Sequence, residues 1–245
     1  MNKIILLSII AVFLLINCNE RNHSVDKSEN KNNTLTDSEK NDGWILLFDG
    51  NTLNGWHEFG EKIVGHGWIV DNGEISCIMN EKEHTGDLVT NNTFANFDFI
   101  CEWKISAGGN SGLFYHIIDD GKYTSTIQTA PEYQLIDDIG FPAILEEWQK
   151  TGANYAMHNV EVNKKLKPVG EWNLSRIVIQ DSIVSHYLNG EKILEFKQWT
   201  KDWFEKVKNS KWKEYPDYGI HKDGHIGLQS HGSSIWFRNI KIKSL

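Results

Sequence analysis

The sequence predicts an all-β protein, an antiparallel sandwich or jelly roll with one or two short helices. Two observations beyond Gly43 support this fold class: many short segments alternate apolar and polar residues, and turn-forming dipeptides separate them. A third observation is that helices do not alternate with the strands, as they would in a parallel sheet. No internal repeat or second low-complexity break occurs, so residues 43–245 are expected to form one domain.

The expected strands are justified in chain order. Residues 67–76 form two short apolar runs around Asn72-Gly73, the signature of a tight hairpin. In residues 97–105 every second residue is apolar or Cys, which predicts a half-buried strand. Further strands are expected over residues 110–116, 132–137, 174–179, 183–188, 193–196, 224–229 and 235–242, with turns near Asp181-Ser182 and Asn189-Gly190.

One segment has helical rather than β periodicity. Trp199, Trp203, Phe204 and Val207 fall on one face at helical spacing, and Thr200 stands where an N-cap would. We expect this helix to pack its aromatic stripe on the sandwich. A second, shorter helix is expected around residues 143–149.

Charge and composition exclude several functional classes. The 245 residues include 25 Lys and Arg against 33 Asp and Glu, a net charge of -8 that argues against a nucleic-acid partner. The 10 Trp indicate either an unusually aromatic core or a surface site that uses flat rings. No catalytic-serine motif, P-loop or dinucleotide fingerprint is present.

The N-terminus is typical of a secreted bacterial protein. Lys3 precedes an apolar run over residues 4–16 that is short for a membrane span, so residues 1–17 are predicted to be a signal peptide. The run ends in Leu-Ile-Asn-Cys, which resembles a lipobox in which Cys18 becomes the acylated first residue. Asn17 is bulkier than usual there, which leaves an ordinary secretory signal or an uncleaved anchor open. The prediction is a lipoprotein of the bacterial cell envelope, periplasmic or surface-exposed, held at the membrane through lipid on Cys18.

Residues 18–42 are almost wholly polar, and such a segment buries too little apolar surface to fold. They are predicted to be a disordered tether that holds the domain off the membrane, or else a disordered terminus without that role. Cys77 and Cys101 could pair in an oxidising compartment, but each lies in an apolar segment. Two buried free thiols are therefore slightly favoured over a disulfide.

A series of motifs resembles the 3-keto-disaccharide hydrolase family over residues 44–245. These motifs are LFDGNTLNGW (47–56), GGNSGLFY (108–115), APEYQ (130–134), KPVGEWN (167–173), LNG (188–190), GHIGLQSHG (224–232) and WFRNI (236–240). The resemblance implies a concanavalin A-like β-sandwich and cleavage of glycosides that carry a ketone at C3. Family members often have Asp where this chain has Ala156 and Ser230, so no carboxylate role is transferred to those positions.

A ketone at C3 makes the proton on C2 acidic, and cleavage can then begin by elimination. The chemistry needs a base for that proton, a group that holds the enolate, and an acid for the departing oxygen. Water added to the enone completes a hydrolysis. Two alternatives remain: a noncatalytic carbohydrate-binding module and an ordinary glycosidase with paired carboxylates. The last is disfavoured because Gln134 stands where a second acid beside Glu132 would be.

Glu132 is the main candidate for the base. Alternation along residues 132–137 sends Glu132 and Gln134 to one face and Tyr133 and Leu135 to the other. If the latter pair faces the core, Glu132 faces a groove, and its apolar flank would raise the carboxyl pKa. A carboxylate on a solvated strand face is the alternative. Asp137 is assigned to the following turn.

The other candidates lie within the matched motifs. His116 and His231 are proposed for proton transfer, although a structural histidine is an equal alternative at either position. Alternation places Asn110 and His116 on one face and predicts a common pocket for them. Arg238 has two possible roles: it could contact the sugar, or it could stack on aromatic rings at the core edge. The residues expected to contact the sugar are Asn110, Gln134, Lys167, Trp172 and Arg238.

No cofactor is predicted. A divalent cation is left open, although the histidines lack the HxH or HExxH spacing of a zinc site. Without a dinucleotide fingerprint, the chain is not expected to oxidise its own substrate. That step is assigned to a separate sugar 3-dehydrogenase acting upstream.

Overall fold

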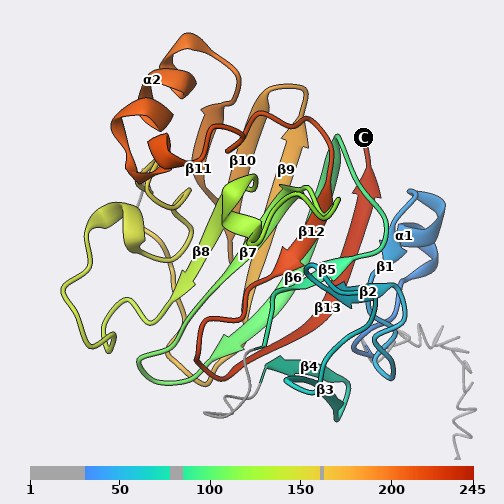
Figure 1. Ribbon diagram of the computed structural model, residues 1–245. Helices are drawn as coiled ribbons and strands as arrows, with labels where there is room; N and C mark the ends of the chain where they lie inside the picture. The colour runs from blue at the N-terminus through green and yellow to red at the C-terminus, as the bar shows by residue number, and fades with distance from the viewer. Residues whose placement is uncertain (1–30, 78–84, 161–162) are drawn as a thin grey trace, which may run out of the picture. The chain divides into compact units, whose positions relative to one another are not determined.

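The computed structural model describes residues 31–77, 85–160 and 163–245. Within them, two antiparallel sheets pack face to face as a concanavalin A-like sandwich, which confirms the predicted fold class (Figure 1). The eight-stranded sheet has the order β11-β10-β9-β6-β13-β4-β3, with β1 paired to β13, and the five-stranded sheet has the order β2-β5-β12-β7-β8.

The strands are short, and most begin or end at the predicted turns. The first sheet contains β1 (Ile45–Leu46), β3 (Trp68–Asp71), β4 (Glu74–Cys77), β6 (Phe97–Ile105), β9 (Asn173–Gln180), β10 (Ile183–Leu188), β11 (Glu191–Lys197) and β13 (Ile235–Ser244). The second contains β2 (Trp56–Glu58), β5 (Leu88–Thr90), β7 (Asn110–Ile117), β8 (Glu132–Ile136) and β12 (His225–Leu228). The strands β1, β2 and β5 were not expected, because two or three residues are too few to show alternation.

The core lies between the two sheets and is largely aromatic. Trp103 on β6 is paired with Phe237 on β13, and both are almost fully buried. The Trp103 indole donates to Ser175 Oγ over 2.9 Å, so its polar edge is satisfied inside the core. Burial of one such side chain contributes about 2 to 3 kcal/mol, which explains why the alternating pattern of β6 determines the face it presents.

Positive φ values confirm two of the predicted Asn-Gly turns. Asn72 and Gly73 have φ values of 51° and 76°, and Asn189 and Gly190 have 49° and 87°. Two successive residues with positive φ match the twist of a hairpin, which is why Asn-Gly is favoured there.

The helices are few. Besides α1 (Asp37–Asn41) and α2 (Lys201–Asn209), the described part of the chain contains three 3₁₀ turns, η1 (Thr126–Gln128), η2 (Glu147–Gln149) and η3 (Lys211–Glu214). Thr200 caps α2 as predicted, because its side-chain oxygen accepts from Trp203 N over 3.1 Å. The helix expected around residues 143–149 is reduced to η2. Among the described residues no helix is long and apolar enough to cross a membrane.

The folded unit begins earlier than predicted. Asn33 is buried and exchanges hydrogen bonds with Asn239: its N–H donates to Oδ1 of Asn239 over 2.6 Å, and its own Oδ1 accepts from Asn239 N over 2.8 Å. A capping box between Thr36 and Glu39 starts α1. The prediction of a disordered tether is therefore wrong for residues 31–42, because polar side chains attach this segment to β13. The predicted signal peptide and Cys18 lie outside the described residues.

Cys77 and Cys101 are both buried and free, as the interpretation of two buried thiols requires. Burial raises the pKa of each thiol, and that of Cys101 lies well above its ordinary value. Both residues therefore act as small apolar core side chains.

Candidate active site

A groove of about 560 Å³ lies on the face of the five-stranded sheet that points away from the core. Its floor comes from neighbouring strands, and segments from distant parts of the chain form its walls. The floor carries Asn110 of β7, Glu132 and Gln134 of β8, and Gln229 just after β12; the walls carry Glu58, Asp87, Ser125, Tyr155, Lys211 and His231.

Strand alternation puts Glu132 in this groove as predicted. Tyr133 and Leu135 are fully buried in the core between the sheets, and Glu132 and Gln134 on the opposite face are 3% and 2% exposed. Gly112 pairs with Gln134 across the ladder. A Cβ at Gly112 would lie 2.3 Å from Glu132 Oε1, so this glycine leaves the space that the carboxyl occupies.

Burial raises the pKa of Glu132 to about 8. The positive charge of Lys211 and a hydrogen bond from the Gln229 side chain oppose the shift, whereas the negative charge of Asp87 adds to it. A carboxylate whose conjugate acid has such a pKa is a stronger base than one in water, and it can exchange protons near neutral pH.

Three predicted residues form a hydrogen-bonded row beside Glu132. Gln134 Nε2 donates to Asn110 Oδ1 over 2.7 Å, and Asn110 Nδ2 lies 3.3 Å from His231 Nδ1. When that amide donates, Nδ1 of a neutral His231 is the acceptor and its ring proton lies on Nε2. The Gln229 side-chain oxygen is buried without a hydrogen-bond partner among the described residues, so it can accept from a ligand hydroxyl.

The expectation that His116 shares this pocket is wrong. Across the β7–β12 ladder, Phe114 pairs with Gly227 but Ile117 pairs with His225, so β7 contains one extra residue there. His116 has a φ of 55°, is 1% exposed, and its Nε2 lies 2.9 Å from the carbonyl oxygen of Ala95. The bulge turns the imidazole away from the groove, and burial lowers its pKa.

Lys167, Trp172 and Arg238 also lie outside the groove. Lys167 Nζ donates to the Trp172 carbonyl oxygen over 2.8 Å, and the Arg238 guanidinium lies 4.0 Å from the Trp172 ring centroid. Arg238 Nε donates to Glu102 Oε2 over 2.7 Å on the outer face of the first sheet. The alternative interpretation of Arg238, an arginine stacked on an aromatic ring, is the one that the structure supports.

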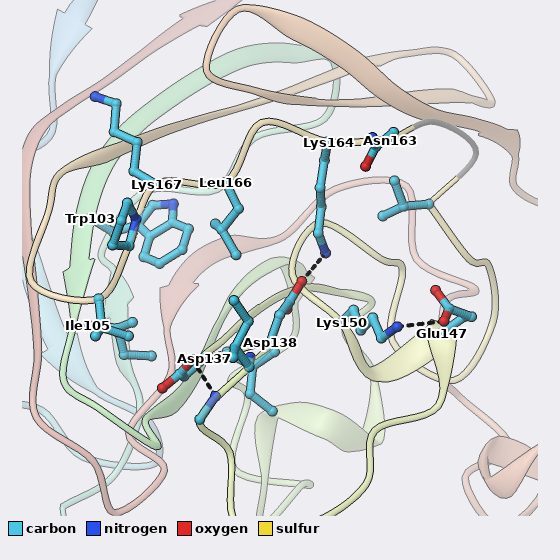
Figure 2. A pocket seen from close by; sticks show the side chains of 16 residues that line it. Trp103, Ile105, Asp137, Asp138, Glu147, Lys150, Asn163, Lys164, Leu166 and Lys167 are labelled. Carbon is cyan, nitrogen blue, oxygen red and sulfur yellow. Dashed lines mark hydrogen bonds and ion pairs between the residues drawn. The ribbon is translucent and has the colours of Figure 1, made fainter.

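Lys167 lines a second cavity, which is larger, at about 770 Å³ (Figure 2). Its charged groups are engaged with each other: Lys164 pairs with Asp138 at 2.6 Å and Lys150 with Glu147 at 2.5 Å. Asp137 accepts from Ile139 N and Gly140 N in the turn that follows β8, as predicted, and also from Gly108 N before β7. This cavity therefore offers no unpaired base, and the smaller groove is the better candidate active site.

Asp87 and Lys211 are two of the four charged groove residues that the sequence analysis missed; the other two are Glu58 and Glu61. Asp87 accepts from Ser230 N over 2.9 Å and from the Thr126 hydroxyl, so a carboxylate lies beside Ser230. Lys211 comes from η3, after the predicted helical stripe has ended. No motif or spacing marks either residue, because their positions depend on long-range packing. Within the described residues, no three His, Cys, Asp or Glu side chains are grouped closely enough to hold a metal ion.

Comparison with known proteins agrees with the fold. A 3-keto-disaccharide hydrolase of Bacteroides thetaiotaomicron is 33% identical over 229 residues, 83% of this chain and 79% of that protein. A crystal structure from Parabacteroides distasonis, provisionally described as a glycosyl hydrolase, is 43% identical with a TM-score of 0.82 and covers 88% of this chain and all of its own. A second such structure from that organism is 28% identical with a TM-score of 0.63, covering 82% of this chain and 99% of its own.

The family comparison covers the whole sandwich. Residues 43–243 match the family of the 3-keto-alpha-glucoside-1,2-lyase-like domain. The chain therefore belongs to the family of the 3-keto-alpha-glucoside-1,2-lyase-like domain.

Proposed function

We propose that this protein cleaves glycosidic bonds in 3-keto-glycosides, beginning with removal of the C2 proton by Glu132. The observation that carries the proposal is a buried carboxyl with a raised pKa on the floor of a groove lined with amide side chains. The name of the Bacteroides thetaiotaomicron relative supports the choice of substrate. A noncatalytic sugar-binding groove would gain nothing from a carboxylate whose ionisation burial makes costly.

The reaction divides into two proton transfers. The Glu132 carboxylate takes the C2 proton, and the electron pair of that bond forms an enolate with the C3 ketone. When the enolate collapses, the bond between C1 and the glycosidic oxygen breaks, and His231 at the groove rim protonates the departing oxygen. Water added at C1 of the enone completes a net hydrolysis. Asn110, Gln134 and Gln229 bind the sugar hydroxyls.

Elimination is preferred to direct displacement for a structural reason. Displacement needs two carboxyl groups placed about the anomeric carbon, either as acid and nucleophile or as acid and base. The next side chain on the same face of β8 is the Gln134 amide. Of the other groove carboxylates, Asp87 already accepts from Ser230 and Thr126, Glu58 accepts from Gly65 N and Gly86 N, and Glu61 is exposed. A single buried base suits the proton on C2.

The test compares a glycoside with its 3-keto counterpart, following products by mass. We expect cleavage of the 3-keto compound, slower turnover when C2 carries deuterium, and exchange of that position with solvent. Cleavage of the unoxidised glycoside alone would refute the proposed substrate class. Single turnovers without an isotope effect or label change at C2 would refute elimination while leaving the family unaffected.

The setting of the reaction is part of the proposal. The protein would act in the cell envelope, anchored through lipid on Cys18. A separate sugar 3-dehydrogenase would supply the ketone, because residues for hydride transfer to a dinucleotide have no signature in the sequence.

A further inference from the structure

We propose that Lys211 is the catalytic residue that holds the C3 oxygen of the substrate while the enolate forms. This inference rests on the proposed function. The cations that the sequence analysis expected to contact the sugar were Lys167 and Arg238. Both of those cations lie away from the groove, on partners of their own.

An enolate formed in the groove needs a positively charged group beside it, because several carboxylates line the groove. Four carboxylate residues line it, Glu58, Glu61, Asp87 and Glu132, whereas Lys211 is the one lysine or arginine among its described lining residues. An enolate formed there would face negative charge on several sides. Lys211 is the groove side chain that can offset this repulsion with a permanent positive charge.

The position of Lys211 is fixed by aromatic packing. Trp212, the next residue, is fully buried and stacks on Tyr218 with ring centroids 4.2 Å apart. Its indole N–H donates to the Tyr155 carbonyl oxygen over 3.2 Å, and Ser210 Oγ accepts from Trp212 N at the start of η3. These contacts attach η3 to the groove wall and orient the side chain before it.

The Lys211 ammonium group is held by rings rather than by a carboxylate. Its Nζ lies 4.2 Å from the Tyr155 ring centroid and 4.4 Å from that of Trp212, and it makes no salt bridge with any described residue. The two cation–π contacts hold the Lys211 ammonium group in place, and its N–H groups are not taken up by any described carboxylate partner. The donors therefore remain able to bind a substrate oxygen.

Lys211 and Glu132 are electrostatically coupled across the groove. Desolvation lowers the pKa of Lys211, and the Glu132 charge opposes that shift. When Glu132 accepts the C2 proton it loses its negative charge, and a negative charge develops on the C3 oxygen instead. The ammonium thus keeps a negative partner throughout the step, which is the preorganised stabilisation that lowers a barrier.

The step balances without another reactant. The proton moves from C2 to the Glu132 carboxylate, the C2–H electron pair becomes the C2–C3 double bond, and the carbonyl π electrons move onto the C3 oxygen. Lys211 donates a hydrogen bond to that oxygen and keeps its own proton. Collapse of the enolate regenerates the ketone and expels the glycosidic oxygen from C1.

The experiment compares Lys211→Met, Lys211→Arg and the control Lys213→Met, an exposed lysine in the same turn. On a 3-keto-glycoside, Lys211→Met should lower kcat about 100- to 1000-fold and slow C2 exchange equally, with a smaller effect on KM. Lys211→Arg should restore much of the rate. Arginine stays charged at high pH, so it should also move the alkaline fall of kcat/KM upward. Lys213→Met should match the wild type.

Several results would overturn the inference, and they differ from failure of the proposed function. If Lys211→Met, with an unchanged melting temperature, kept kcat and C2 exchange within threefold of the wild type, Lys211 would not hold the enolate. A rise in KM alone would limit it to ground-state binding. An adduct at Lys211 trapped by borohydride would show that it acts as an amine. Loss of the proposed function would instead appear as wild-type protein that neither exchanges C2 nor cleaves the 3-keto-glycoside.

Discussion

Replacing Glu132 with Gln should make the protein more stable at alkaline pH while removing its activity. The side chain keeps its size but loses the charge that the buried groove disfavours. The carboxyl pKa is about 8 in the folded protein against an ordinary value of 4.5. Between pH 4.5 and pH 8 the Glu132 carboxyl is protonated in the folded state and ionised in the unfolded state. The free energy of unfolding of the wild type therefore falls as pH rises through this range.

The magnitude follows from the interval between the two pKa values. The slope is about 1.4 kcal/mol per pH unit for one proton, and over roughly 3.5 units the penalty reaches about 5 kcal/mol. In Glu132→Gln this penalty is absent. The difference in unfolding free energy, variant minus wild type, should therefore increase by up to about 5 kcal/mol from pH 4.5 to pH 8 and then level off.

The assay is urea unfolding of both proteins at intervals of one pH unit from 4.5 to 8.5. Other titrating groups are common to both proteins and cancel in the difference. The control is Glu205→Gln on the exposed surface of α2, which makes the same substitution outside the groove. Turnover of a 3-keto-glycoside by Glu132→Gln should fall at least about 100-fold. A stability difference that does not change with pH would refute the raised pKa, and near-wild-type activity would refute the role of Glu132 as base.

Three further predictions test other parts of the molecule. Burial lowers the pKa of His186 to about 4, so between pH 6.5 and pH 4 the unfolded state binds a proton that the folded state does not, and the free energy of unfolding should fall as pH drops. In urea unfolding, His186→Phe should reduce this slope by about 1.4 kcal/mol per pH unit. An unchanged slope would contradict the lowered pKa. Gly112→Ala puts a methyl group within 2.3 Å of Glu132 Oε1 and should lower kcat at least about tenfold, while circular dichroism should show that the fold is retained. Full activity would show that the position of the Glu132 carboxyl is not critical. Cys18 should carry fatty acid and direct the protein to membranes, as measured by metabolic labelling and fractionation, whereas an unlipidated soluble product with Cys18 intact would disprove the anchor.

Local sequence determined the β-architecture because its signals act over a few residues. Alternation in β6 specifies which side chains enter the core, and successive positive φ values at Asn72-Gly73 and Asn189-Gly190 specify the hairpins. Alternation also placed Glu132 and Gln134 on one face of β8, which is sufficient to predict a groove carboxylate. These features need no knowledge of which strands are neighbours.

The tertiary structure decided which residues meet in the groove. A bulge opposite Ile226 moved His116 out of a face that strict alternation assigned to it, and strand periodicity cannot reveal an extra residue in one partner. Arg238 lies on the outer face of the eight-stranded sheet, because its strand β13 pairs with β6 there, whereas the groove lies on the five-stranded sheet. Lys211 lines the same groove as Glu132, and the stacking of Trp212 on Tyr218, a contact between segments with no shared pattern, fixes it there. A catalytic charge arrangement depends on such long-range packing, since Coulomb interactions depend on distance in space rather than on position in the chain.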